Sequence, residues 1–335
     1  MHRIIADVVK IKNPIKIEDL TFLVETITGC LKSDDAKDNP VDKFIWIPFG
    51  KALLDCLKNE TTIEISPLQN NLAIVLRGLG DYQTAKELLE KALALDEKNL
   101  GELHPMTAIS YSNLATVLMD LGNYQAAKIL LEKALASNEK NFGELHAITA
   151  ISYSNLAMVL QDLGDYQAAK ILLEKALASN EKNFGELHAT TAISYSNLAT
   201  ALQNLGDYQG AKKLLKKALA SDEKNLGESH PMTAISYSNY ALVLKDLGDY
   251  QGAKKLLKKA LASDEKNFGE LHSSTALRHL NLATVYYALK DYQRAAELSA
   301  KAVTIFTKIL PEGHPNIALA IGWDEGIKKK LKENK

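Results

Sequence analysis

Histidines recur at a fixed spacing along this chain, and histidine is a common ligand of metals. Each lies 42 residues after the one before it. They are His104, His146, His188, His230, His272 and His314. Zinc ligands converge to about 2 Å from one ion, whereas packed helices lie about 8–10 Å apart. One histidine per helical unit cannot satisfy that geometry. His104-Pro105 instead suits a helix N-terminus, because proline favours the first turn and keeps the preceding residue out of the helix. We therefore expect capping histidines, no metal and no cofactor.

The segment FGK at residues 49–51 suggests a second kind of chemistry, a phosphate-binding loop. That motif requires a glycine five residues before the Gly of the Gly-Lys pair and a Ser or Thr directly after the lysine. Ile45 and Ala52 occupy these two positions. The sequence also shows no pairing of a nucleophile with a base. We therefore expect a binding protein and not an enzyme.

Asparagine recurs with the same spacing, in the middle of a predicted helix. The set is Asn71, Asn113, Asn155, Asn197, Asn239 and Asn281. Asparagine is a poor helix former because its side chain competes for backbone hydrogen bonds, so this recurrence needs a reason. One interpretation is a hydrogen bond to the neighbouring unit. The other is a ladder of amides along an extended peptide, to which each amide offers a donor and an acceptor. The sequence leaves both open.

These residues belong to six units of 42 residues each. The units are 63–104, 105–146, 147–188, 189–230, 231–272 and 273–314. In the second unit, the spacing of apolar residues predicts two amphipathic helices, over about residues 106–121 and 125–141. Gly122 suits the left-handed end of the first helix, and Lys290 replaces this glycine in the sixth unit. One helix pair cannot bury its apolar face alone, so the units must stack.

The predicted core of the second unit is made of apolar residues at helical spacing. It comprises Tyr111, Leu114, Ala115 and Leu118 of the first helix and Ala127, Leu130, Leu131, Ala134 and Leu135 of the second.

The segment YSNLATVLMDLGNYQAAKILLEKAL, which begins at Tyr111, resembles the tetratricopeptide repeat (TPR) family, and the resemblance covers roughly residues 63–314. The usual period is about 34 residues. The longer period is similar to that of kinesin light chains and of the TPR sensor regions of bacterial signalling ATPases. The resemblance implies an all-α, right-handed α-solenoid with its first helices lining a concave groove.

Units two and three differ at five positions, two of which lie inside the first helix. Both fall on or beside a stripe of Ile109, Asn113, Thr116 and Asp120 that points away from the predicted core. Across the units, the first position carries Ile74, Thr116, Met158, Thr200, Leu242 and Thr284. The second carries Arg77, Met119, Gln161, Gln203, Lys245 and Tyr287. Because core positions hardly change, we interpret this stripe as a groove adapted to a peptide or protein ligand. Drift of exposed positions is the alternative.

Lysines are concentrated in the second helices of units four and five. They are Lys212, Lys213, Lys216, Lys217, Lys254, Lys255, Lys258 and Lys259. An acidic partner or a nucleic acid is one interpretation. No aromatic residues are interleaved, however, and Asp and Glu lie nearby. We therefore favour a solvated convex face.

The ends of the chain do not follow the repeat. Residues 1–62 are expected to form an N-terminal helical cap, with one helix over 15–31, a charged linker, and another helix after the aromatic run at 44–49. Residues 315–335 are expected to form a polar C-terminal capping helix. The region 1–62 also resembles the segment that joins a nucleotide-binding switch domain to its TPR sensor in signalling ATPases. The resemblance implies an alternative function, the detached sensor half of such a system.

Composition excludes other classes of protein. The 335 residues carry a net charge of −1 and two cysteines. Such a charge creates no strong field toward nucleic acid or membranes, and few cysteines suit a reducing compartment. No signal peptide or apolar run of about 18 residues is visible. We expect a cytoplasmic, non-catalytic scaffold that binds a protein or peptide.

Overall fold

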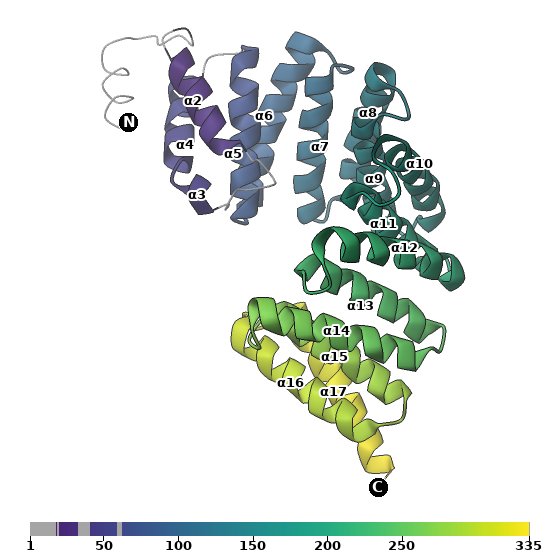
Figure 1. Cartoon of the computed structure of the whole chain (residues 1–335). Coiled ribbons are helices and arrows are strands. Elements are labelled where there is room, and N and C mark those ends of the chain that lie inside the picture. The colour runs from purple at the N-terminus through teal and green to yellow at the C-terminus, as the bar shows by residue number, and fades with distance from the viewer. Residues whose placement is uncertain (1–17, 19, 33–40, 59–61, 335) are drawn as a thin grey trace. The chain divides into compact units, whose positions relative to one another are not determined.

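The computed structural model describes residues 18, 20–32, 41–58 and 62–334. All regular secondary structure in these ranges is helical. The chain divides into two compact units, Met1–Asp165 (unit 1) and Tyr166–Lys335 (unit 2), and this division falls between the two helices of the third predicted repeat. Within each unit the helices form antiparallel pairs that stack on one another (Figure 1). The predicted all-α solenoid of helix-turn-helix repeats is confirmed.

Unit 1 begins with helices that precede the repeats. Its elements are α2 (Thr21–Leu31), α3 (Val41–Phe44), α4 (Ile47–Cys56), the 3-10 turn η2 (Ile63–Ile65), α5 (Ser66–Gly78), α6 (Tyr82–Leu100), α7 (Pro105–Asp120), α8 (Tyr124–Phe142) and α9 (Ala147–Asp162). Both α2 and α4 pack on α5. A Cβ at Gly50 would lie only 3.2 Å from Leu31 Cδ1 and 3.4 Å from Leu72 Cδ2, so glycine permits this close approach. Of the helix expected over 15–31, the structure shows α2 from Thr21 onward. Residues 15–17 and 19, and residues 33–40 of the expected linker, lie outside the described ranges.

Unit 2 continues the series and ends in one unpaired helix. Its elements are α10 (Tyr166–Phe184), α11 (Ala189–Asn204), α12 (Tyr208–Leu226), α13 (Pro231–Asp246), α14 (Tyr250–Phe268), α15 (Ser273–Ala288), α16 (Tyr292–Ile309) and α17 (Pro315–Glu333). The last helix packs on α16 and buries Ala320 and Ile327. Most of its other side chains are exposed, as a helix that closes the core against water requires.

Repeats two to six use the same start signals, and a turn residue with positive φ joins their two helices. In the second repeat, His104 Nδ1 accepts a hydrogen bond from the backbone N–H of Met106 at 3.2 Å. Asn123 caps the following helix by accepting from the N–H of Ala126, and Gly122 between the two helices has φ +75°. The histidine contact recurs at His146, His188, His230, His272 and His314. The capping role predicted for the histidines is therefore confirmed.

The predicted core is buried, with two exceptions in the second helix. Tyr111, Ala115 and Ala127 are completely buried, whereas Leu130 and Leu135 are only partly buried. Two polar residues of the same helix, Ser137 and Asn138, are buried as well. The second helix therefore contributes hydrogen-bonding groups to the contact with the next repeat.

Lys290 is the one non-glycine residue with positive φ in the described ranges, at 62°. It occupies the turn position that glycine holds in the other repeats. We predict that Lys290→Gly raises the free energy of unfolding by about 1 kcal/mol, because the left-handed conformation costs an L-residue about 1–2 kcal/mol. Thermal melts followed by circular dichroism should show an increase of about 2–4 °C in the melting temperature.

The reverse change at Gly248 is the matched control, because this glycine has φ +81° at the same position of the preceding repeat. Gly248→Lys should lower the melting temperature by a similar amount. Two unchanged melting temperatures would show that the turn stores no strain.

Candidate functional site

The first helices of successive repeats lie on the inner side of each unit. In unit 1, α5 contacts α7, and α7 contacts α9; in unit 2, α11 contacts α13, and α13 contacts α15. Successive second helices make no comparably close contact within the described part of either unit. First helices that approach one another more closely than second helices must lie on the inside of a curve. This inner face is the surface that the sequence predicted as a groove.

An exposed apolar side chain recurs on the inner helices of repeats two to six and, at the same spacing, on α17. Its exposed fraction ranges from 37% to 58%. The residues are Ile109 and Ile151 in unit 1 and Ile193, Ile235, Leu277 and Leu319 in unit 2. We call this row the apolar ladder. Of these residues, only Ile109 was placed on the exposed stripe by the sequence. The 42-residue spacing could have identified the others.

All but one of the variable positions predicted for the groove are exposed or partly exposed on this stripe. Exposed side chains among them are Ile74, Met158 and Thr200, and partly exposed ones are Thr116, Leu242, Arg77, Met119, Gln161, Gln203, Lys245 and Tyr287. Thr284 differs, because it is buried. The stripe therefore presents mixed chemistry along each unit. Whether it contacts a ligand stays a prediction.

Two of these side chains contact a neighbouring helix. Arg77 forms an ion pair with Asp120 of the next repeat. The Tyr287 ring meets Trp323 of α17 edge-on, with the ring centroids 6.3 Å apart. The first and sixth repeats thus use this position to hold neighbouring helices.

The asparagines divide into two groups. Asn71 Nδ2 donates to the Thr28 carbonyl at 3.0 Å, Asn113 Nδ2 to Asn70 Oδ1 at 3.0 Å, and Asn281 Nδ2 to Ser238 Oγ at 3.3 Å. These three amides hold the preceding helices, which is the structural interpretation. No side-chain hydrogen bond is found for the other asparagines in the described ranges. They are Asn155, Asn197 and Asn239, for which the ligand interpretation stays a prediction.

A cluster of charged and aromatic groups joins successive repeats, and we call it the tyrosine tie. In unit 2, the Tyr195 hydroxyl donates to Glu181 Oε1 at 2.5 Å. The Lys217 ammonium lies over the Tyr195 ring, 5.1 Å from its centroid, and contacts Glu186 at 3.4 Å. Tyr237 forms the same tie with Glu223, Lys259 and Glu228, and Tyr111 forms it with Glu97, Lys133 and Glu102.

The tie changes how its phenol titrates. Burial, together with the hydrogen bond to Glu223, raises the pKa of Tyr237 to about 12. Burial and the hydrogen bond to Glu181 likewise raise the pKa of Tyr195 above its ordinary value of 10.0. The folded protein therefore favours the neutral phenol. This contribution to stability is complete below about pH 10 and is lost as the pH rises through the folded pKa.

We predict an alkaline loss of stability that depends on these phenols. The double variant Tyr195→Phe/Tyr237→Phe should be less stable at about pH 8, by about 1 kcal/mol or more per site, because each loses a hydrogen bond to a carboxylate. Its free energy of unfolding should then fall less than that of the wild type between about pH 9 and 11. Urea unfolding at each pH measures both quantities.

Tyr208 and Tyr250 provide the control, because they begin α12 and α14 and take no part in the ties. Changing both to phenylalanine should leave the alkaline fall as steep as in the wild type. If the double variant at the ties falls as steeply as this control, the phenols do not cause the effect.

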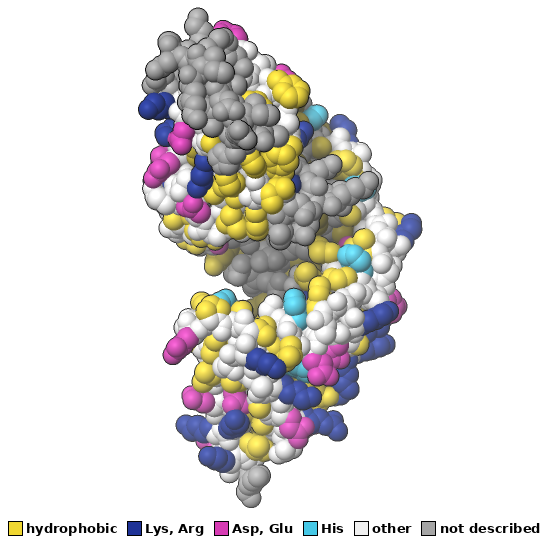
Figure 2. Space-filling view, turned by 90° about the vertical axis from the view of Figure 1, so that its left-hand side faces the viewer, with side chains coloured by type: hydrophobic (Ala, Val, Ile, Leu, Met, Phe, Trp, Pro, Cys, Tyr) yellow, Lys and Arg dark blue, Asp and Glu magenta, His cyan; other side chains and the backbone are white. Residues whose placement is uncertain are grey.

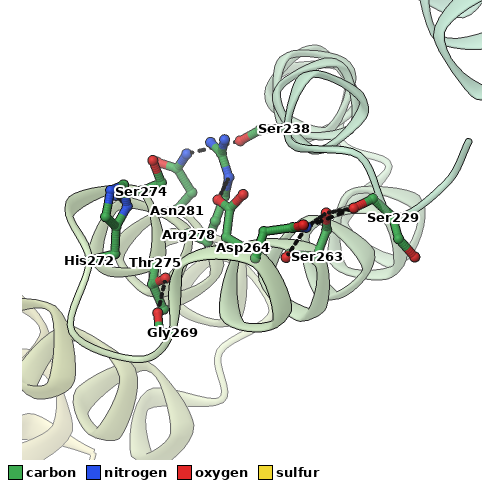
Figure 3. A network of polar contacts seen from close by, with 11 residues as sticks. Ser229, Ser238, Ser263, Asp264, Gly269, His272, Ser274, Thr275, Arg278 and Asn281 are labelled. Carbon is green, nitrogen blue, oxygen red and sulfur yellow. Dashed lines mark hydrogen bonds and ion pairs between the residues drawn. The ribbon is translucent and has the colours of Figure 1, made fainter. Parts of the chain in front are cut away.

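The sixth repeat replaces the usual pair of side chains at this interface. Arg278 stands where repeats two to five have serine, and its Nε lies 3.0 Å from Asp264 Oδ2 in a buried ion pair (Figure 3). Burial raises the pKa of Asp264, while Arg278 acts in the opposite direction.

His279 stands at the position of the tyrosine ties, which Tyr237 holds in the preceding repeat, and its Nε2 lies 3.9 Å from Glu265. A cavity of about 330 Å³ opens beside the imidazole, lined among others by Glu270. None of this was predicted from the sequence.

We predict that Arg278→Leu costs about 3–5 kcal/mol of stability, because it leaves the Asp264 carboxylate buried without a positive partner. Arg278→Ser should cost less than half as much. Serine can donate to Asp264 as Ser236 donates to Asp222 at 2.5 Å in the preceding interface. Urea unfolding compares the two. Equal losses of stability in the two variants would mean that the stability depends on the size of the Arg278 side chain and not on its charge.

Other kinds of site find no support in the described residues. No three His, Cys, Asp or Glu side chains in these ranges come together in a way that could hold a metal ion. Of the helices in the same ranges, none combines the length and apolar character that a membrane span requires.

Stacked helix pairs with an inner face of amides and apolar side chains define a helical-repeat scaffold. The family model for the tetratricopeptide repeat matches residues 64–140, 107–182, 190–266 and 233–308. The chain therefore belongs to the tetratricopeptide repeat family. Such repeats generally serve as scaffolds for protein–protein interaction and present extended concave surfaces, and we assign the chain to that class. No curated protein sequence matches it.

Solved structures of other helical-repeat proteins resemble this chain in fold. The nearly identical TPR-like repeats assigned to a Podosopora anserina kinesin light chain are 32% identical, with a TM-score of 0.55, 59% of this chain covered and 93% of that one. BtubC (BKLC) from P. vanneervenii is 22% identical, with a TM-score of 0.58 and coverage of 70% and 93%. The apo form of RapI is 16% identical, with a TM-score of 0.64 and coverage of 85% and 98%. The predicted resemblance to kinesin-light-chain-type arrays is thus confirmed.

Proposed function

We propose that the chain is a non-catalytic scaffold whose inner face binds an extended segment of a partner protein. The observation that carries this proposal is the pairing of Asn197 and Asn239 with the apolar ladder. Both amides lie on inner helices and make no side-chain hydrogen bond in the described part of the chain. The ladder residues Ile193 and Ile235 stand one helical turn before them, partly in water. Polar and apolar groups repeat together, once per repeat.

The spacing of the repeats fits an extended peptide. Packed helices lie about 8–10 Å apart, and an extended chain rises about 3.3 Å per residue. About three peptide residues therefore span one repeat. An asparagine amide can donate to one peptide carbonyl and accept from one peptide N–H. The ladder residue beside it can contact an apolar side chain of every third residue.

We also propose a cytoplasmic location and a protein partner, with no nucleic acid bound. Cys30 and Cys56 are both free thiols, and reducing compartments keep thiols in that state. The net charge of −1 provides no general attraction for a polyanion as large as nucleic acid.

The test changes Asn155, Asn197 and Asn239 together to alanine. The probe is the strongest peptide selected by the full chain from a displayed library, and fluorescence anisotropy measures its affinity. Each lost amide should cost about 0.5–1.5 kcal/mol of binding, so affinity should fall about tenfold or more. The melting temperature should not fall, because alanine is the better helix former.

The matched control changes Asn71, Asn113 and Asn281 to alanine. These amides hold preceding helices, so this variant should melt at a lower temperature. The proposal fails if the Asn155/Asn197/Asn239 variant binds the selected peptide as tightly as the wild type does. It also fails if that variant loses melting temperature as the control does.

A further inference from the structure

The second helices of unit 2 fall into two kinds that differ in charge. Helix α10 carries Ile171 and Glu174 on its outer side. At the same two positions α12 carries Lys213 and Lys216, and α14 carries Lys255 and Lys258. We call the last four residues the lysine patch. All four are exposed.

The lysine patch removes ion pairs that the other second helices have. In α10, Lys170 pairs with Glu174 at 3.7 Å, and the same pair is present as Lys128–Glu132 in α8 and Lys86–Glu90 in α6. Lysine replaces that glutamate in α12 and α14. Each of these helices now has like charges four residues apart, which destabilises a helix where the opposite charges would stabilise it.

No residue of the lysine patch forms an ion pair within the described ranges of the chain. Neighbouring lysines behave differently, since Lys217 and Lys259 belong to tyrosine ties and Lys254 lies over the ring of Tyr286. The patch is therefore an excess of positive charge with no structural use. Figure 2 shows that Lys and Arg side chains gather along one edge of its lower half.

We propose that the lysine patch binds a short acidic segment of a partner protein, rich in Asp or Glu. Lys213 and Lys216 lie less than one helical turn apart, so each helix offers two ammonium groups within about 5 Å along its axis. Lysine is a flexible point charge and pairs with carboxylates without demanding a fixed geometry. The same pair of charges recurs on α12 and α14, which fits a run of a few carboxylates.

The surroundings of the patch favour a short segment over a long polyanion. Asp207 and Asp249 cap the N-terminal ends of the two helices, and Glu223 follows toward the C-terminal end of α12. A nucleic acid strand would extend beyond the lysines and meet these carboxylates. A brief acidic run ends before it reaches them. The patch lies on second helices, so it does not depend on the inner face proposed above.

The experiment compares two quadruple variants of the full chain with equal net charge. In the first, Lys213, Lys216, Lys255 and Lys258 are changed to glutamine. In the second, four exposed lysines in the last turns of α6, α8, α12 and α14 are changed in the same way. These are Lys98, Lys140, Lys224 and Lys266. The probes are labelled oligoglutamate, oligoglutamine of the same length, and an oligothymidylate of equal charge, measured by anisotropy at low ionic strength.

The wild type should bind oligoglutamate and not oligoglutamine. The patch variant should bind oligoglutamate about tenfold or more weakly, since each exposed ion pair contributes modestly and four are lost. The second variant should lose less than about twofold. Equal losses in the two variants would overturn the proposal, because they would show a response to net charge alone. Tighter binding of the oligothymidylate than of oligoglutamate, or no binding of oligoglutamate by the wild type, would also overturn it.

A third variant guards against misfolding. The changes Lys213→Ile, Lys216→Glu, Lys255→Ile and Lys258→Glu give both helices the residues that α10 carries at these positions. That combination already folds in this chain and restores the Lys–Glu pair. It should melt at or above the wild-type temperature and still lose oligoglutamate binding. Retained binding in this variant would refute the patch as the site.

Discussion

Each helix pair in this chain has more apolar surface than it can bury by itself, and the contact with the next repeat must cover the rest. That contact also buries polar groups, which cost free energy unless they find hydrogen-bond partners. Tyr195 is completely buried, and its hydroxyl reaches the carboxylate of Glu181. Asn180 reaches Ser194 in the same contact. Because these partners meet only when two repeats are in the correct register, the polar groups select the register while apolar burial provides the stability.

This division of roles explains where the repeats are free to vary. The interface takes up one side of each first helix and of each second helix. Arg77, Asn113 and Asn281 of the inner stripe also reach across it, whereas side chains such as Thr200 and Lys245, and the outer side of the second helices, take no part in it. Thr200 and Lys245 can therefore differ from their counterparts without disturbing the stack, and so can Lys213. Surfaces for partners can change on a constant framework, since the residues that hold the repeats together are elsewhere.

The sequence predicted the helices, the caps and the exposed stripe because each follows from spacing within one repeat. It could not predict which asparagines would be used to hold the stack, because that depends on a neighbour 43 residues earlier. Asn113 finds the side-chain oxygen of Asn70. The corresponding neighbour of Asn155 is Ser112, whose hydroxyl donates to the Ala108 carbonyl, and no hydrogen bond joins Asn155 to it in the described ranges. The ion pair between Arg278 and Asp264 was missed for the same reason, since two separate substitutions became partners only across an interface.

That last interface has a consequence for the number of repeats. Where successive interfaces between repeats use the same side chains, a whole 42-residue repeat can be gained or lost, because the repeats that become neighbours still present complementary side chains. The repeat that carries Arg278 is more selective. It needs an acidic side chain before it, as Asp222 or Asp264 provides, and Asn138 or Asn180 in that place would leave the guanidinium buried without a counter-charge. Expansion or contraction of the gene is therefore compatible with folding in the middle of the array, while the order of its last members is constrained by electrostatics.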